Sequence, residues 1–89
     1  MSASHLVVVA PSELESAADK IRRLQTEARI LAREQVEALA AALEHVSQLA
    51  GEVVEGGEFY PVGARELAAR LVEDANKRAL ALNAILERS

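Results

Sequence analysis

The sequence has no cysteine and no tryptophan, and Phe59 and Tyr60 are its only aromatic residues. Without cysteine, disulfide bonds and thiolate metal sites are excluded. The 89 residues are enough for one domain. A chain of this size buries only about 60 to 65% of its extended surface when it folds alone, so its stability margin is thin. Association with another chain is therefore the remaining way to enlarge the core.

Positive charge is also scarce. Ten basic residues stand against fourteen acidic ones, for a net charge of -4. This balance disfavours nucleic acid and anionic membrane surfaces as partners. The segment from Met1 to Ala10 lacks the basic start of an export signal, and no run approaches the ~20 apolar residues of a membrane span. We therefore expect a cytoplasmic protein. Eight arginines against two lysines, with abundant alanine, indicate a bacterial origin.

What the sequence does contain is helix formers, with 18 alanines and 12 leucines. No glycine or proline interrupts residues 12–50. Ser12 followed by Glu15 is a capping-box pattern, which predicts that a long first helix begins at Ser12. The helix covers either about 12–50 or about 12–55, because both Gly51 and the pair Gly56-Gly57 are candidate stops.

A second helix is predicted over about 64–88, after a loop that contains both aromatic residues. Gly63 is the expected N-cap, with Val62 facing Leu67 in a hydrophobic staple. Oppositely charged residues four apart support both helices. These expected pairs are Asp19 with Arg23, Glu66 with Arg70, Glu73 with Lys77, and Asp74 with Arg78.

The predicted fold is all-α, a long helical hairpin over residues 11–89 preceded by a short N-terminal segment, 1–10. The shorter second helix covers only the C-terminal part of the first, where the apolar stripe is Ala32, Val36, Leu39, Leu43, Val46 and Ala50. It leaves an overhang from Ser12 to about Thr26 without an intrachain partner. We expect a second copy to cover this overhang, giving a homodimer that is a four-helix bundle. The predicted dimer interface is Leu14, Ala17, Ile21, Leu24, Ala28 and Leu31.

Three further features are candidates for partner docking. The first is a local excess of positive charge, because Lys20, Arg22, Arg23, Arg29 and Arg33 stand against Asp19 and Glu27. The second is the aromatic pair, either an interface anchor or a plug over the loop end of the hairpin. The third is Leu6 to Val9, whose β-branched residues predict an extended strand, although a disordered terminus fits equally well.

His45 is the only histidine expected inside a helix. Dimeric helical hairpins with a histidine on the first helix are the general layout of histidine phosphotransfer and kinase-dimerisation domains. Such a histidine needs cations beside it to settle the phosphoryl charge. The residues that follow His45 in this sequence are instead Val46, Ser47, Gln48 and Leu49. We therefore expect His45 at the edge of the core and keep phosphotransfer as an alternative function.

The sequence predicts no catalytic residue, metal ligand or cofactor site. Neither predicted helix carries His-x-x-x-His or Glu-x-x-His, which are typical zinc-ligand spacings. The main hypothesis is a small non-enzymatic module that acts through protein association, as an adaptor, regulator or assembly subunit. A weaker alternative is a nucleic-acid-associated regulator that uses Arg22, Arg23 and Arg29.

Overall fold

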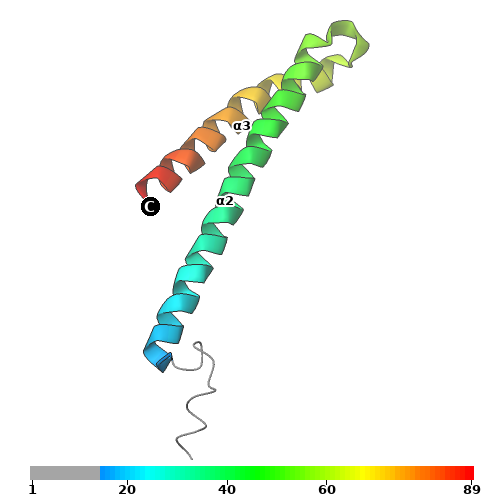
Figure 1. The fold of residues 1–89 in the computed structure, drawn as a ribbon. Helices are drawn as coiled ribbons and strands as arrows, with labels where there is room; N and C mark the ends of the chain where they lie inside the picture. Colours follow the sequence, from blue (N-terminus) through cyan, green and yellow to red (C-terminus); the bar gives the residue numbers. More distant parts are fainter. Residues whose placement is uncertain (1–14) are drawn as a thin grey trace, which may run out of the picture. The chain divides into compact units, whose positions relative to one another are not determined.

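A computed structural model describes residues 15–89. The chain divides into two compact units, Met1–Leu31 and Ala32–Ser89, and each is described by itself. The elements are α2 (Ala17–Glu55), a short 3-10 helix η2 (Gly57–Phe59) and α3 (Val62–Arg88) (Figure 1). No strand occurs within residues 15–89. The predicted helical hairpin is confirmed, and it lies within the second unit. The segment Leu6–Val9 falls outside the described residues.

The first helix begins at Ala17, five residues after the predicted start at Ser12. Glu15 and Ser16 are not helical, and α2 starts at Ala17. Ser16 acts as the N-cap, because its Oγ accepts the backbone N–H of Asp19 at 3.1 Å. The predicted cap Ser12 lies outside the described residues. Serine followed by an acidic residue three positions later occurs twice in this stretch, and the structure uses the second instance.

The C-terminal end of α2 lies at the second of the two candidate stops. Gly51 is inside the helix, and Glu55 is the last helical residue. The N–H of Gly56 still bonds to the carbonyl of Glu52 at 3.0 Å. Gly57 then takes a positive φ of 64°, which residues with a side chain rarely adopt. The left-handed residue at Gly57 therefore ends the helix.

The start of α3 differs from the prediction. The N-cap position belongs to Pro61, not Gly63, and the first helical bond runs from the N–H of Arg65 to the carbonyl of Pro61 at 3.1 Å. Proline suits this position because its fixed φ matches the turn and its missing N–H is not needed. Val62 and Leu67 remain 61% and 58% exposed, so the predicted hydrophobic staple is wrong.

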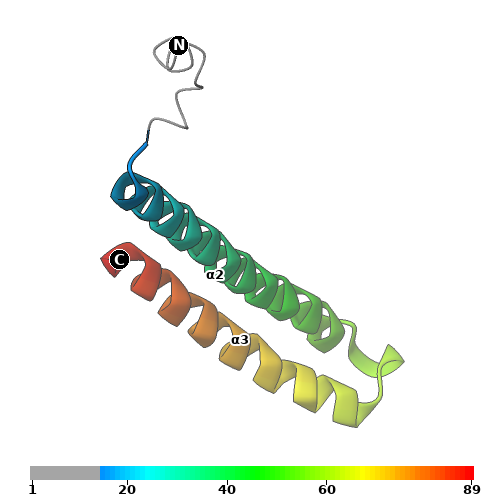
Figure 2. The same ribbon diagram turned by 90° about the horizontal axis from the view of Figure 1, so that it is seen from below.

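Within the second unit, α3 packs antiparallel against residues 32–55 of α2 (Figures 1 and 2). The buried residues of both helices, with half-buried residues between them, are spaced at steps of three and four residues, the pattern of a coiled-coil seam. On α2 these positions are Val36, Ala40, Leu43, Ser47 and Ala50. On α3 they are Ala68, Val72, Ala75, Ala79, Leu82 and Leu86.

Small side chains dominate this seam. Five of the six buried hydrophobic residues are alanines, and Leu86 is the only large one. Helices with alanine at the contact approach closely, toward the ~8 Å end of interaxial distances. Ser47 fits the same space, and its Oγ donates to the carbonyl of Val72 at 3.2 Å. The hydrogen bond satisfies the one buried polar side chain of the seam and links the two helices.

The seam shares Val36, Leu43 and Ala50 with the predicted stripe, but it is rotated about the axis of α2 away from the other large members of that stripe. The prediction placed Leu39 and Val46 against the second helix, but they are 52% and 38% exposed. The seam positions next to them are occupied by Ala40 and Ser47, which are 2% and 7% exposed. The larger side chains are thus displaced from the closest helix contact and form a second apolar face on α2.

Candidate docking surface

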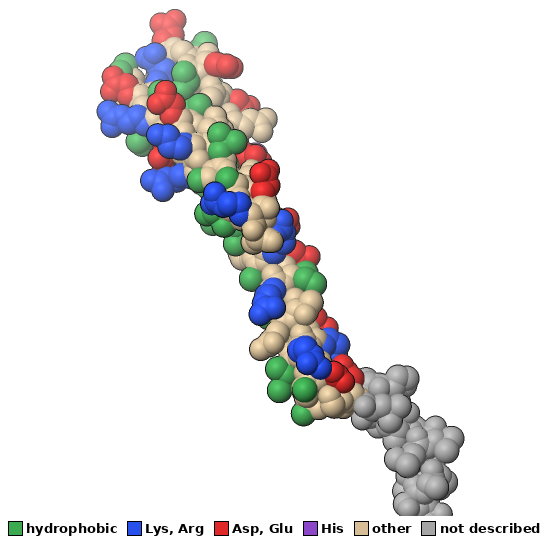
Figure 3. Space-filling model, turned by 90° about the vertical axis from the view of Figure 1, so that its left-hand side faces the viewer, with side chains coloured by type: hydrophobic (Ala, Val, Ile, Leu, Met, Phe, Trp, Pro, Cys, Tyr) green, Lys and Arg blue, Asp and Glu red, His purple; other side chains and the backbone are tan. Residues whose placement is uncertain are grey.

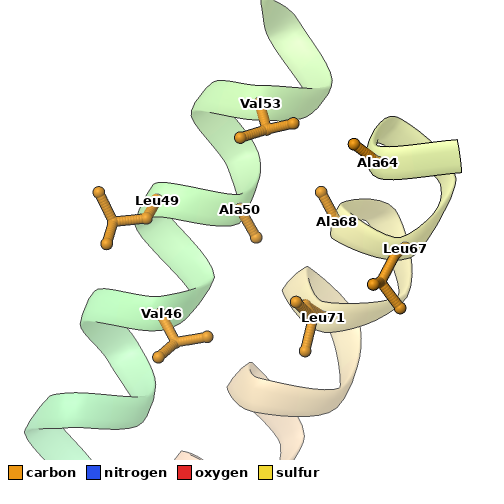
Figure 4. Close-up of a pocket in the computed structure, with 8 residues that line it drawn as sticks. All are labelled: Val46, Leu49, Ala50, Val53, Ala64, Leu67, Ala68 and Leu71. Carbon is orange, nitrogen blue, oxygen red and sulfur yellow. The ribbon is translucent and has the colours of Figure 1, made fainter. Parts of the chain in front are cut away.

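An open apolar groove runs along one face of the hairpin near its loop end. Its volume is about 330 Å³. Val46, Leu49, Ala50 and Val53 line it from α2, and Ala64, Leu67, Ala68 and Leu71 line it from α3 (Figure 4).

The groove has a buried floor and exposed walls. Ala50 and Ala68 are 6% and 5% exposed and lie between the two helices. The walls are formed by larger side chains, of which Leu49 is 50% and Leu67 58% exposed. Because none of the eight lining residues has a polar side chain, nothing in the groove could orient a polar substrate or cofactor. A surface of this kind fits the apolar side chains of another polypeptide.

The first unit carries a separate row of exposed apolar residues on α2. Ile21, Leu24 and Leu31 are 55%, 49% and 66% exposed, and Ala17 and Ala28 are also exposed. These are the described members of the predicted dimer interface, and Leu14 lies outside the described residues. Among residues 15–89, fifteen large hydrophobic side chains are exposed, and Figure 3 shows hydrophobic side chains at the surface among charged ones. Exposure on this scale is typical of an interaction surface.

Charge is divided unevenly along α2. Residues 17–33 contain five basic residues and two acidic ones. Residues 34–55 contain five acidic residues and neither lysine nor arginine. The acidic residues of this second segment are Glu34, Glu37, Glu44, Glu52 and Glu55, all of them exposed. The helix therefore has a basic segment followed by an acidic segment.

The docking candidates Arg22 and Arg23 form ion pairs within the first unit. Arg22 pairs with Asp19, and Arg23 lies between Glu15 and Glu27, at 3.2 and 3.3 Å. The hydrogen bond from Arg22, followed by those of Ser16, lowers the pKa of Asp19. The hydrogen bond and charge of Glu15 raise the pKa of Arg23. Arg29 forms no ion pair with the residues that the structure describes.

Of the four ion pairs expected from spacing, the structure contains Asp74 with Arg78, at 2.9 Å. Asp19 was expected to pair with Arg23 and pairs instead with Arg22, one residue closer. Arg23 is engaged instead by Glu15 and Glu27.

The aromatic residues lie at the turn between the helices and differ in how far they are exposed and in what they contact. Phe59 is 94% exposed, so it does not plug the loop end of the hairpin. Tyr60 lies against Gly56, where an added Cβ would overlap its ring. The N–H of Tyr60 bonds to the carbonyl of Gly57 at 3.1 Å, and Arg65 Nε donates to the carbonyl of Tyr60 at 3.2 Å.

His45 is exposed, and not at the edge of the core as expected. It lies in the acidic segment of α2, residues 34–55, which holds no lysine or arginine. A phosphorylated imidazole needs cations to settle its charge, and its own helix offers none in this segment. The exposure of His45 permits phosphotransfer, whereas the acidic segment of its own helix disfavours it.

Residues 15–89 contain no cluster of three histidine or carboxylate side chains arranged to hold a metal ion. None of the helices described is both long and apolar enough to span a bilayer. The chain matches no known protein family, no curated protein and no solved structure.

Proposed function

We propose that this protein is a non-enzymatic association module, a homodimer of helical hairpins that forms a four-helix bundle and serves as an adaptor, regulator or assembly subunit. The observation that carries the proposal is the apolar groove near the loop end of the hairpin. Its wholly apolar lining suits the side chains of another helix and offers no chemistry to a substrate.

A second copy of the chain is the favoured occupant because the hairpin core is too small. Each buried alanine contributes one methyl group, worth roughly 0.8 kcal/mol, whereas fixing the backbone of one residue costs about 1 to 2 kcal/mol. The exposed leucines Leu49, Leu67 and Leu71 could each add about 1.5 to 3 kcal/mol if a partner covered them. Self-association supplies that cover to both copies at once.

Light scattering at micromolar concentration tests the proposal directly. We expect the wild-type protein to have twice its chain mass of 9.5 kDa. Leu49→Lys and Leu67→Lys place a charge on the walls of the groove and should each yield monomers.

Leu80→Lys is the matched control. Leu80 is 71% exposed and does not line the groove, so this variant should remain dimeric with unchanged helix content. A wild-type mass of 9.5 kDa, or equal behaviour of all three variants, contradicts the proposed function.

A further inference from the structure

We propose that the groove of one copy is filled by residues 17–31 of α2 from a second copy, with the two α2 helices antiparallel. This inference rests on the proposed homodimer and adds its orientation, its register and the segment that docks. It follows from three independent features of α2: its two exposed apolar rows, the division of its charge, and the residues that flank the rows.

The apolar rows of the two segments are similar in length and both repeat at steps of three and four residues. In the docking segment the row is Ile21, Leu24, Ala28 and Leu31, with steps of three, four and three residues. In the second unit the exposed or half-buried row is Ala42, Val46, Leu49 and Val53, with steps of four, three and four. Read in opposite directions, the four pairs stay within one residue of a common register, or about 1.5 Å along the helix. The pairs are Ile21 with Val53, Leu24 with Leu49, Ala28 with Val46, and Leu31 with Ala42.

This register brings the docking segment to the groove itself. The exposed Val46 and Leu49 and the half-buried Val53 form the α2 wall, and Leu67 and Leu71 lie across from them on α3 (Figure 4). Ile21 and Leu24 of the second copy would therefore lie between two walls of apolar side chains. They are about half exposed in the single chain, as are Leu49 and Leu67, so the contact covers both surfaces at once.

The charge division of α2 selects the antiparallel orientation. It sets residues 17–33 of one copy, with five basic residues against two acidic, beside the acidic residues 34–55 of the other. A parallel arrangement would bring five glutamates of one copy against the same five of the other. Like charges placed side by side disfavour that arrangement.

The flanking residues supply specific pairs in the same register. Lys20 and Glu27 each precede a member of the first row by one residue, and His45 and Glu52 each precede a member of the second. A two-fold axis between antiparallel helices brings the same flank of each helix together. Lys20 is then beside Glu52 of the second copy, and Glu27 is beside His45. This arrangement gives the exposed His45 a role in partner recognition.

Site-specific cross-linking tests the orientation, and the absence of native cysteine makes it direct. Lys20→Cys and Glu52→Cys are prepared as separate full-length proteins, mixed, re-equilibrated and treated with a short bismaleimide linker. The oligomeric mass of each sample is measured first by light scattering. The matched control is a mixture of Lys77→Cys with Glu52→Cys. Lys77 is exposed on α3 and does not line the groove.

We expect a covalent dimer in the mixture of Lys20→Cys with Glu52→Cys, and none in either variant alone or in the control mixture. Cross-linking of Glu52→Cys to itself would show a parallel dimer and overturn the inference. A dimeric mass without the expected cross-link would overturn it as well, while leaving the proposed homodimer intact. A monomeric mass in every sample would reject the homodimer itself.

Discussion

Gly51 lies inside α2 and Gly56 directly follows its last residue, and a methyl group should have opposite effects on stability at the two positions. An added Cβ at Gly51 meets nothing within 4 Å, whereas at Gly56 it overlaps the ring of Tyr60. Gly51→Ala should therefore raise the free energy of unfolding by about 0.5 to 1 kcal/mol, because alanine is the better helix former. Chemical denaturation measures this change.

Gly56→Ala should lower the free energy of unfolding, since Tyr60 must leave its place against the helix. The backbone of Gly56 is ordinary for any residue, with φ at -69°, so the loss arises from the ring and not from strain. The double variant Gly56→Ala, Tyr60→Ala separates these causes, because the second change should remove most of the loss of the first. Equal stabilisation by Gly51→Ala and Gly56→Ala would contradict this account.

Asp19 should make the first turn of α2 sensitive to acid. Hydrogen bonds from Arg22 and then Ser16 lower its pKa below the usual value of 3.8. A lowered pKa means that the ionised carboxylate stabilises the fold. The contribution is complete above the usual value and is lost as the pH falls through the lowered one. NMR titration of the Asp19 carboxyl group should show a midpoint below 3.8.

Arg22→Gln is the control for this titration. It removes the largest cause of the shift, so the midpoint of Asp19 should move back toward its usual value, while the bond from Ser16 to the Asp19 N–H is retained. An unchanged midpoint in this variant would show that Arg22 does not stabilise the carboxylate.

At the scale of elements, the close packing of α2 and α3 rests on alanine. Ala79 is 2% exposed at the seam, whereas Ala69 is exposed on the same helix. Ala79→Leu should force the helices apart and lower the free energy of unfolding by about 1 to 3 kcal/mol. Ala69→Leu should change it by less than about 0.5 kcal/mol. Thermal unfolding of the two variants followed by circular dichroism makes the comparison, and equal effects would contradict an alanine seam.

Within residues 15–89, the two long helices and their order could be predicted from the sequence, because α2 lacks proline and ends at a glycine pair, whereas the short helix η2 was expected to be a loop. Their boundaries were less predictable. Ser12 and Ser16 both precede an acidic residue by three positions, and sequence spacing alone does not choose between them. The sequence pattern favoured Gly63 as the N-cap of α3, but Pro61 holds that position in the structure.

The seam was harder to predict than the helices. A hydrophobicity pattern favours Leu39 and Val46 over Ala40 and Ser47, yet close helix approach favours the small residues. For the same reason the groove could not be predicted, since its walls consist of larger side chains that the seam leaves out. The exposed row at Ile21, Leu24 and Leu31 was predictable, because it depends only on the excess length of the first helix.

For the whole molecule, the antiparallel dimer predicts a charge-swap experiment. Lys20→Glu should raise the dimer dissociation constant by about three- to tenfold, because the two-fold repeats the contact and an exposed ion pair is worth up to about 1 kcal/mol. Adding Glu52→Lys should restore most of the affinity. Sedimentation velocity measures the constants. Additive losses in the double variant would contradict the pairing of Lys20 with Glu52.

The central claim is that the apolar face of the hairpin is covered by a second copy, so that folding and association are coupled. The most direct measurement is the midpoint of thermal unfolding, followed by circular dichroism, over a roughly hundredfold range of protein concentration. Mass action predicts that the midpoint rises with concentration, by several degrees for a chain of this size. A midpoint that stays constant across the range, with a cooperative transition, would contradict the account.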